Sequence, residues 1–336
     1  RSYDSKDELA QHYDALNDIN LKNVIRSNSS IMYMYYSYIT VLSYFFALNK
    51  KDNIVKKEYY YDEWDFYQKK YKKSWCRIFI STIGTEDELS KVKTNVRLNK
   101  ILIKLHSLIF FLQKKIQFIF NQDVWLKRQV DGSEIDIDSF VNGYLSLLLK
   151  KPLDERLYLL KTKKLQSIVF SILLDSSLST DSFLYENCRV IDFLQNICLI
   201  LGEVFTNIGI TFSLSYFFSN THVNCSFVKV KDFYTNWYTV RSKVLHIVPQ
   251  GYTRVGPALR HCISELKNFK CPNKVLILLS DSKPTDYDFY EGFYGIEDVR
   301  QVIREILINN IKFKNFSVFD KSTLIHLSRM YGKNNF

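Results

Sequence analysis

Two uninterrupted apolar runs in the second half of the chain each end in side chains that carry oxygen. The first covers residues 168–174 and leads into Asp175-Ser176-Ser177-Leu178-Ser179, and the second covers residues 275–279 and leads into Ser280-Asp281. A strand with helices on both faces needs a continuous apolar run, because neither face meets water. We therefore predict two central strands of a parallel sheet, each ending beside a carboxylate.

The rest of the second half alternates between short apolar runs and helical patterns. In the segment 187–206, one inward stripe is predicted from the spacing of Val190, Leu194, Ile197, Leu201 and Phe205. Alternation at this pitch predicts a Rossmann-like, doubly wound α/β fold over residues 166–336, with a mostly parallel sheet between helices. Strands are expected at 168–174, 210–217, 223–230, 275–280 and 311–319, and helices at 187–206, 233–245, 257–268, 297–308 and 321–331.

The first half shows a different pattern, whose strongest signal is one long helix. From residue 91 to residue 121, leucines and isoleucines recur on one face and lysines occupy mostly other positions. Shorter helices are predicted at 7–16 and 139–149. We expect residues 1–165 to form a mainly helical α+β region, with the domain boundary near residue 165. Because the chain opens at Arg1 and not at Met, we expect its native start to lie upstream.

One uncharged stretch, residues 27–49, requires a test for membrane insertion. Its apolar part, residues 31–48, is close to the minimum length that spans a bilayer. Five tyrosines, two serines and a threonine lie within that part, and such a polar content favours core strands or a buried helix. We expect no membrane insertion.

Length, net charge and cysteine content indicate the number of domains, the kind of partner and the cellular compartment. With 336 residues and 46% hydrophobic content, the chain can fill the cores of two domains. The formal charge of +11 invites a nucleic-acid hypothesis, but the lysines are scattered and no nucleic-acid motif accompanies them, so we expect no nucleic-acid partner. Six cysteines without Cys-x-x-Cys spacing argue against zinc and are typical of reduced thiols, which favours a cytoplasmic location.

The candidate chemistry lies where the two predicted strands end. Ligands of open α/β sheets sit outside the carboxyl ends of their strands. Asp175, Ser177 and Ser179 stand at alternate positions and can turn their oxygens toward one point. Carboxylate, hydroxyl and water form the ligand set that a hard cation such as Mg²⁺ prefers. A loop before the predicted helix at 257–268 offers a further hydroxyl, Thr253, and the second strand leads into Asp281.

Asp-x-Ser-x-Ser, then a loop threonine, then a strand that ends in aspartate, resembles the metal-ion-dependent adhesion site of von Willebrand factor A domains. The resemblance implies a Mg²⁺ site, with Mn²⁺ as a possible substitute, whose ligands are Asp175, Ser177, Ser179, Thr253 and Asp281. Because Mg²⁺ keeps water ligands in octahedral coordination, such a site leaves a position for a carboxylate of a partner protein.

Longer segments are similar to the NorD/CbbO family of von Willebrand factor A domain proteins. They include Asp175 to Asp181, Gly251 to Gly256 and Lys283 to Asp298, and shorter matches occur in the first half, for example at Glu63-Trp64-Asp65. The resemblance covers nearly the whole chain and is weakest between residues 27 and 121. One departure follows the second strand: the family usually has Thr-Asp-Gly where this chain has Ser280-Asp281-Ser282, which replaces a permissive glycine.

The resemblance implies a non-enzymatic adaptor that works beside a MoxR-type AAA+ ATPase to activate a metalloenzyme, such as nitric oxide reductase or Rubisco. The acidic, aromatic loop after Asp281 is then a candidate docking surface through Asp286, Asp288, Tyr290 and Glu291, although it could instead be a lid that packs onto its own domain. Two alternatives remain open: a metal-dependent phosphohydrolase that uses Asp175 as phosphoryl acceptor, and a basic nucleic-acid-binding protein. No glycine-rich phosphate loop precedes a helix, so we expect no ATP binding by the chain itself.

Overall fold

The computed structural model describes residues 57–83, 88–152, 154–165, 167–185, 188–280, 284–318 and 324–332. The predicted helix at 7–16 and the uncharged stretch at 27–49 lie outside the described residues, and so does Asp281.

A seven-stranded sheet forms the centre of the fold, in the order β1-β2-β10-β9-β6-β11-β12. Its strands are β1 (Lys57–Asp65), β2 (Lys70–Thr82), β6 (Ile168–Asp175), β9 (Thr211–Thr221), β10 (Asn224–Lys231), β11 (Asn273–Ser280) and β12 (Ile311–Ser317). The pairs β2–β10, β9–β6, β6–β11 and β11–β12 are parallel, whereas β1–β2 and β10–β9 are antiparallel. The prediction of a mostly parallel sheet is therefore confirmed, and β6 is buried along its whole length, as its apolar run predicted.

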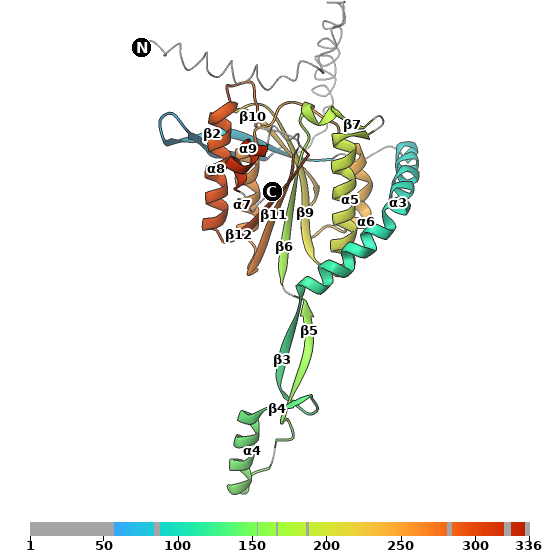
Figure 1. The fold of residues 1–336 in the computed structure, drawn as a ribbon, viewed down its shortest axis with the longest axis vertical. Helices are drawn as coiled ribbons and strands as arrows, with labels where there is room; N and C mark the ends of the chain where they lie inside the picture. Colours follow the sequence, from blue (N-terminus) through green and yellow to red (C-terminus); the bar gives the residue numbers. More distant parts are fainter. Residues whose placement is uncertain are drawn as a thin grey trace, which may run out of the picture.

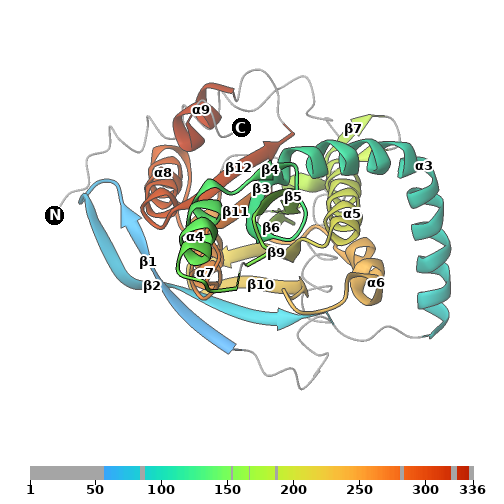
Figure 2. The same cartoon turned by 90° about the horizontal axis from the view of Figure 1, so that it is seen from below.

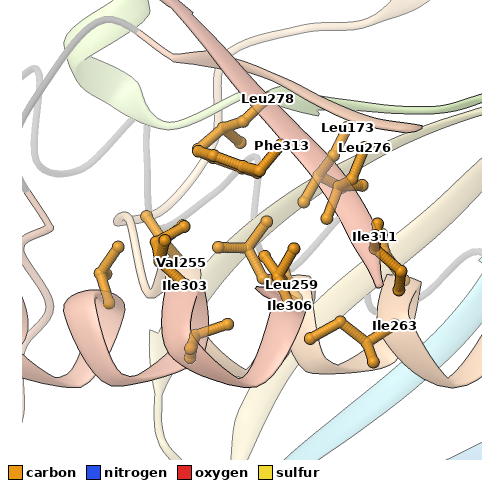
Figure 3. Close-up of a cluster of buried hydrophobic side chains, with 14 of the residues drawn as sticks. Leu173, Val255, Leu259, Ile263, Leu276, Leu278, Ile303, Ile306, Ile311 and Phe313 are labelled. Atoms are coloured by element: carbon orange, nitrogen blue, oxygen red, sulfur yellow. The ribbon is translucent and has the colours of Figure 1, made fainter. Parts of the chain in front are cut away.

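Helices cover both faces of this sheet, as a doubly wound fold requires (Figures 1 and 2). One face carries α7 (Val255–Lys267) and α8 (Gly292–Ile308), together with the short α9 (Leu324–Tyr331). The other carries α3 (Glu88–Phe120) and α5 (Val190–Ile208), together with α6 (Trp237–Val240) and the 3-10 turn Arg241–His246 that follows it. Figure 3 shows Leu173 and Leu276 of the sheet packed against Leu259 of α7 and Ile306 of α8. The predicted α/β class is thus confirmed.

The predicted domain boundary near residue 165 does not match this sheet. Strands β1 and β2, which lie in the half expected to be a mainly helical region, form a hairpin at one edge of the central sheet. Strand β2 pairs in parallel with β10 and buries Cys76 and Ile78. An unpaired edge on β10 would expose a row of backbone donors and acceptors, and the hairpin covers it. The long helix predicted at 91–121 is confirmed as α3, but it packs on α5 as a layer of the same body.

A second, three-stranded sheet extends away from the central body as an arm (Figure 1). It consists of β3 (Asn121–Gln129), β5 (Tyr158–Leu165) and the short β4 (Glu134–Ile135), and it carries α4 (Ile137–Leu148), the helix predicted at 139–149. Figure 1 shows that the arm leaves the body beside the start of β6, at the end opposite to Asp175. The apolar side chains of α4 are largely exposed, and Ile137 is the most exposed of them at 73%.

Among the described helices, α5 has the length and apolar composition of a membrane-spanning helix. About half of it (56% of its most apolar window) is buried within the protein. Its predicted stripe faces the core, with Val190, Leu194 and Phe205 buried, and Gly209 in the left-handed conformation (φ 84°) ends it. The helix therefore packs as a core helix in this fold.

Candidate functional site

The two predicted site strands are neighbours in the sheet, so their carboxyl ends meet at one edge. Leu174 of β6 lies opposite Leu279 of β11 in parallel register. This register places Asp175 beside Ser280, whose hydroxyl donates a hydrogen bond of 2.9 Å to Oδ2 of Asp175. Asp175 is fully buried.

The loop after β6 gathers the oxygens of the Asp-x-Ser-x-Ser motif. The backbone N–H of Ser177 donates to Oδ1 of Asp175 at 3.0 Å, which orients the carboxylate. The hydroxyl oxygens of Ser177 and Ser179 lie 2.9 Å apart. Ser177 is buried, whereas Ser179 is exposed in the 3-10 turn Leu178–Asp181. The structure thus brings three of the predicted ligands together, with Ser179 on the solvent side.

The loop that carries Thr253 is tied to this first loop through its backbone. Leu178 N–H donates to the carbonyl of Gly251 at 3.0 Å, and Gln250 N–H donates to the carbonyl of Ser176 at 2.6 Å. Gly251 has φ 61°, and a Cβ at this position would lie 2.4 Å from the carbonyl oxygen of Ser219, so only glycine fits here. Thr253 itself is buried. Its placement beside the first loop follows from these contacts, which sequence spacing alone could not supply.

Asp281, the fifth predicted ligand, directly follows Ser280 at the end of β11 but lies outside the described residues. Within the described part of the chain, no group of three His, Cys, Asp or Glu side chains could hold a metal ion. The predicted site does not need such a group, because three of its five ligands are hydroxyls. Tyr331 of α9, which sequence reasoning missed, lies close enough that its burial and the charge of Asp175 raise its pKa.

The edges of an octahedron provide a test of whether these residues fit Mg²⁺. With metal–oxygen bonds of about 2.0–2.1 Å, two adjacent ligands stand roughly 2.8–3.0 Å apart. The separation of 2.9 Å between the hydroxyls of Ser177 and Ser179 is that of an ordinary hydrogen bond and also agrees with that edge, so both oxygens could bind one cation without moving apart. Carboxylate and hydroxyl oxygens are also the donor set of a hard cation. The described residues therefore fit the expected metal.

The loop after β11 is divided between buried and exposed side chains. Asp286 and Tyr290, two of the four predicted docking residues, are buried at 6% and 0% exposure. They cannot contact a partner in this conformation, because Asp286 pairs with a buried arginine and Tyr290 donates a hydrogen bond to Asp298. The lid hypothesis is therefore the better description of these two residues. Glu291 is half-buried and precedes α8.

Two other aromatic residues of the same loop are exposed and are accessible to a partner. Tyr287 is 76% exposed and Phe289 is 80% exposed. Phe289 also holds a positive φ of 56°, which is an unfavourable conformation for a bulky residue. Strain of this kind persists where the surrounding structure imposes it and is concentrated at functional sites.

Asp288, the remaining predicted docking residue, is bound by His222 at the turn between β9 and β10. Its Oδ2 accepts hydrogen bonds from the backbone N–H of His222 at 2.7 Å and faces Nδ1 of the ring at 2.6 Å. The ring of Trp75 stacks on His222, with centroids 4.3 Å apart. Burial raises the pKa of Asp288, but the hydrogen bonds from His222 and the charge of Arg254 outweigh it, so the pKa lies below its ordinary value.

This lowered pKa makes part of the stability sensitive to acid. The ionised Asp288 stabilises the fold above its ordinary pKa of 3.8, and this contribution disappears as the pH falls through the lower pKa of the folded state. We expect Asp288→Asn to lower the melting temperature at neutral pH, and we expect this difference from the wild type to begin to shrink below about pH 4 and to disappear only below the lowered pKa of the folded state. Melting curves from pH 7 to pH 3 measure the difference, and a gap that widened on acidification would contradict the assignment.

Arg254, the neighbour of Thr253, is the main residue of this region that sequence reasoning did not single out. Its side chain is 1% exposed, and it contacts carboxylates of Glu63, Asp286 and Asp288. Its sequence position indicated only a loop. A buried guanidinium needs charged partners, and one of them, Glu63, lies 191 positions away in the sequence.

Comparisons with known proteins agree with the resemblance seen in the sequence. The chain is 30% identical over 204 residues to a protein named NorD from Stutzerimonas stutzeri, covering 60% of this chain and 33% of that protein. It is 26% identical over 282 residues to a protein named NorD from Brucella suis biovar 1, covering 84% of this chain and 43% of that protein. The chain therefore spans between a third and a half of the length of these relatives, and its resemblance to NorD is confirmed. No family model matches the chain.

Solved structures give partial overlaps only. The PilB minor pilin from Streptococcus sanguinis overlaps 50% of this chain and 55% of its own, with 15% identity and a TM-score of 0.40. The von Willebrand factor A domain of SpRpn10 overlaps 50% of this chain and 83% of its own, with 12% identity and a TM-score of 0.37. The description of the fold rests on the strand order given above.

Proposed function

We propose that this chain, which is similar over most of its length to proteins named NorD, is a NorD-like accessory protein and not an enzyme. In this proposal it binds Mg²⁺ through Asp175, Ser177, Ser179, Thr253 and Asp281, and it presents this end of the sheet to a protein partner. The finer part of the proposal is that the chain couples a MoxR-type AAA+ ATPase to the activation of a metalloenzyme. In this proposal the protein acts in the cytoplasm.

The observation that carries the proposal is the convergence of oxygens at the end of β6. Asp175 is held by Ser177 and Ser280, and the hydroxyls of Ser177 and Ser179 stand at the separation of two adjacent Mg²⁺ ligands. When bound, the cation would supply one positively charged position for a partner's carboxylate. Ser179 is the exposed member of the set, so that position would face solvent.

Exposed apolar side chains beside this position support protein binding. We define the docking rim as Leu178, Tyr252, Tyr287 and Phe289, which come from the three loops that surround the predicted ligands. Their exposed fractions run from 43% for Tyr252 to 80% for Phe289. Tyrosine and phenylalanine are enriched in protein–protein interfaces relative to the rest of the protein surface. A small-molecule active site would bury its aromatic walls in a cleft.

Mg²⁺ is expected to raise the thermal stability of the protein. A ligand that binds only the folded state stabilises it by about 2.7 kcal/mol when its concentration is a hundred times Kd. Melting curves with EDTA and with increasing Mg²⁺ measure this effect, and Asp175→Ala should abolish it. Ser176→Ala is the matched control, because the Ser176 hydroxyl donates to the carbonyl of Phe217 and is not a predicted ligand. A wild-type melting temperature that Mg²⁺ leaves unchanged would reject the metal site.

Removing the exposed aromatics of the docking rim is expected to weaken partner binding without destabilising the fold. Tyr287→Ser combined with Phe289→Ser should lower the affinity for the MoxR-type ATPase of the same organism by about 1–3 kcal/mol, roughly 5- to 150-fold. Calorimetry or surface plasmon resonance measures the change. Tyr234→Ser is the control, because Tyr234 is also highly exposed, at 85%. It follows β10, which runs antiparallel to β6, so it lies at the opposite end of the strands from the predicted ligands. Equal affinities of the rim variant and the wild type would contradict the proposed surface.

A further inference from the structure

A single buried guanidinium joins the edge hairpin of the sheet to the loops of the predicted metal site. Arg254 Nη1 lies 2.5 Å from Oε2 of Glu63, which belongs to β1, and Arg254 Nε donates to Oδ2 of Asp286 at 2.8 Å. The side chains of Arg254, Glu63 and Asp286 are all at most 2% exposed. Charges removed from water to this degree are stable only together, so the three groups fix one another in place.

Glu63 is itself held by two further donors and cannot move away from Arg254 without losing them. Its Oε1 accepts a hydrogen bond of 2.8 Å from the hydroxyl of Tyr294, and its Oε2 accepts one of 3.0 Å from the thiol of Cys76. The ring of Tyr290 lies under the guanidinium at 4.5 Å. The hairpin β1–β2 therefore supplies a rigid anchor for an arginine that belongs to a distant loop.

On its other side, Arg254 is bound to the site. Its backbone follows directly from Thr253, and its N–H donates to the hydroxyl of Ser219 at 3.1 Å. Thr253 exchanges two backbone hydrogen bonds with Thr285, at 2.7 and 3.1 Å, and Thr285 is the neighbour of Asp286. Arg254 is thus linked to both segments of this backbone pair. It is the chain neighbour of Thr253, and its guanidinium binds the carboxylate of Asp286, the chain neighbour of Thr285.

We infer that Arg254 is the positioning residue of the proposed site: anchored on Glu63 of the β1–β2 hairpin, it holds Thr253 and residues 284–291 in the arrangement that binds metal and partner. The hairpin is then a functional part of the site, although it contributes no ligand. This inference rests on the proposed function for its metal-binding consequence, but the ordering of the loops can be measured without metal.

The decisive variant is Glu63→Gln, which keeps the shape of the side chain and removes its charge. Hydrogen–deuterium exchange without metal should become at least about tenfold faster in peptides covering residues 250–256 and 284–291, because the anchored ion pair is lost and these segments open locally. Exchange in residues 275–279 of β11 should stay unchanged.

Glu305→Gln is the matched control. Glu305 also pairs with a largely buried arginine, Arg260, at 3.2 Å, and it also contacts the hairpin through a hydrogen bond of 2.9 Å from Tyr71. Glu305 forms no hydrogen bond or ion pair with Arg254 among the described residues, so loss of its charge should leave exchange at 250–256 and 284–291 unchanged. Unchanged exchange of these two segments in Glu63→Gln, or equal acceleration in every peptide of that variant, would overturn the inference.

A second variant and a second measurement separate positioning from general stability. Arg254→Lys keeps the charge but cannot bridge Glu63 and Asp286 at once, so it should show the same local acceleration even if Glu63→Gln fails to fold. Both variants should also raise the Mg²⁺ concentration at half-saturation at least about tenfold, since Thr253 loses its support. A wild type that does not respond to Mg²⁺ would reject the metal site alone, whereas a responding wild type with variants of equal affinity would reject the role of Arg254.

Discussion

Arg254→Ala is expected to lower the free energy of unfolding by about 3–5 kcal/mol, among the largest effects of any single substitution in the described chain. The variant leaves the carboxylates of Glu63 and Asp286 buried without their cation. Burial of a charge without its counter-ion is costly, because hydrogen bonds such as those from Tyr294 and Cys76 to Glu63 replace only part of the lost hydration. Urea denaturation followed by circular dichroism measures the change.

Arg300→Ala is the control for this prediction. Arg300 pairs with Glu297 at 3.3 Å on the surface, where its side chain is 44% exposed. Exposed ion pairs contribute about 0–1 kcal/mol, so the control should lose far less stability than Arg254→Ala. If the two variants unfolded at similar urea concentrations, the buried cluster would not have the energetic role assigned to it.

Leu173→Ala is expected to cost about 2–5 kcal/mol of unfolding free energy. Leu173 is fully buried in β6 and packs in the cluster that includes Leu259 and Ile306 (Figure 3). Strands on either side and helices above prevent the site from collapsing around a smaller side chain, so a cavity remains. Thermal or urea unfolding tests this value. Leu178→Ala, at a position that is 48% exposed, should change stability by less than about 0.5 kcal/mol.

The same substitution connects the core to the site. Residues two apart on a strand point to the same face, so Leu173 lies beneath Asp175 on β6. If the packing of Leu173 supports the carboxylate, Leu173→Ala should weaken Mg²⁺ binding in addition to lowering stability. A variant that is less stable but binds Mg²⁺ with wild-type affinity would show that hydrogen bonds from Ser177 and Ser280 are sufficient to hold Asp175.

The strands that carry the predicted ligands could be recognised from the sequence because their signal is local. The apolar runs at 168–174 and 275–279 became β6 and β11, and the helical stripe at 187–206 became α5. A strand with a continuous apolar run is stable only where both of its faces are covered, so each run predicted a strand buried in the centre of the sheet. The proximity of Asp175 and Ser280 follows from the parallel pairing of those two strands.

The hairpin β1–β2 could not be predicted in the same way. Its residues mix charged and aromatic side chains without a clear period, and only a few of them, such as Cys76 and Ile78, are buried. Its place in the sheet depends on pairing with β10, almost one hundred and fifty residues later. For the same reason, Asp286 and Tyr290 looked like surface residues of an acidic loop and were assigned to docking, whereas contacts with Arg254 and Asp298 bury them.

The sequence by itself thus determined the α/β class and the two strands at whose ends the predicted oxygen ligands stand, since hydrophobic periodicity and short motifs act between neighbours along the chain. Only the tertiary structure decided that the first half completes the sheet and that Arg254 joins that half to Thr253. It also decided which side chains of the loop 284–291 face water. Those outcomes depend on contacts between residues far apart in sequence, where burial of a charge is tolerated only if a distant partner arrives to pair with it.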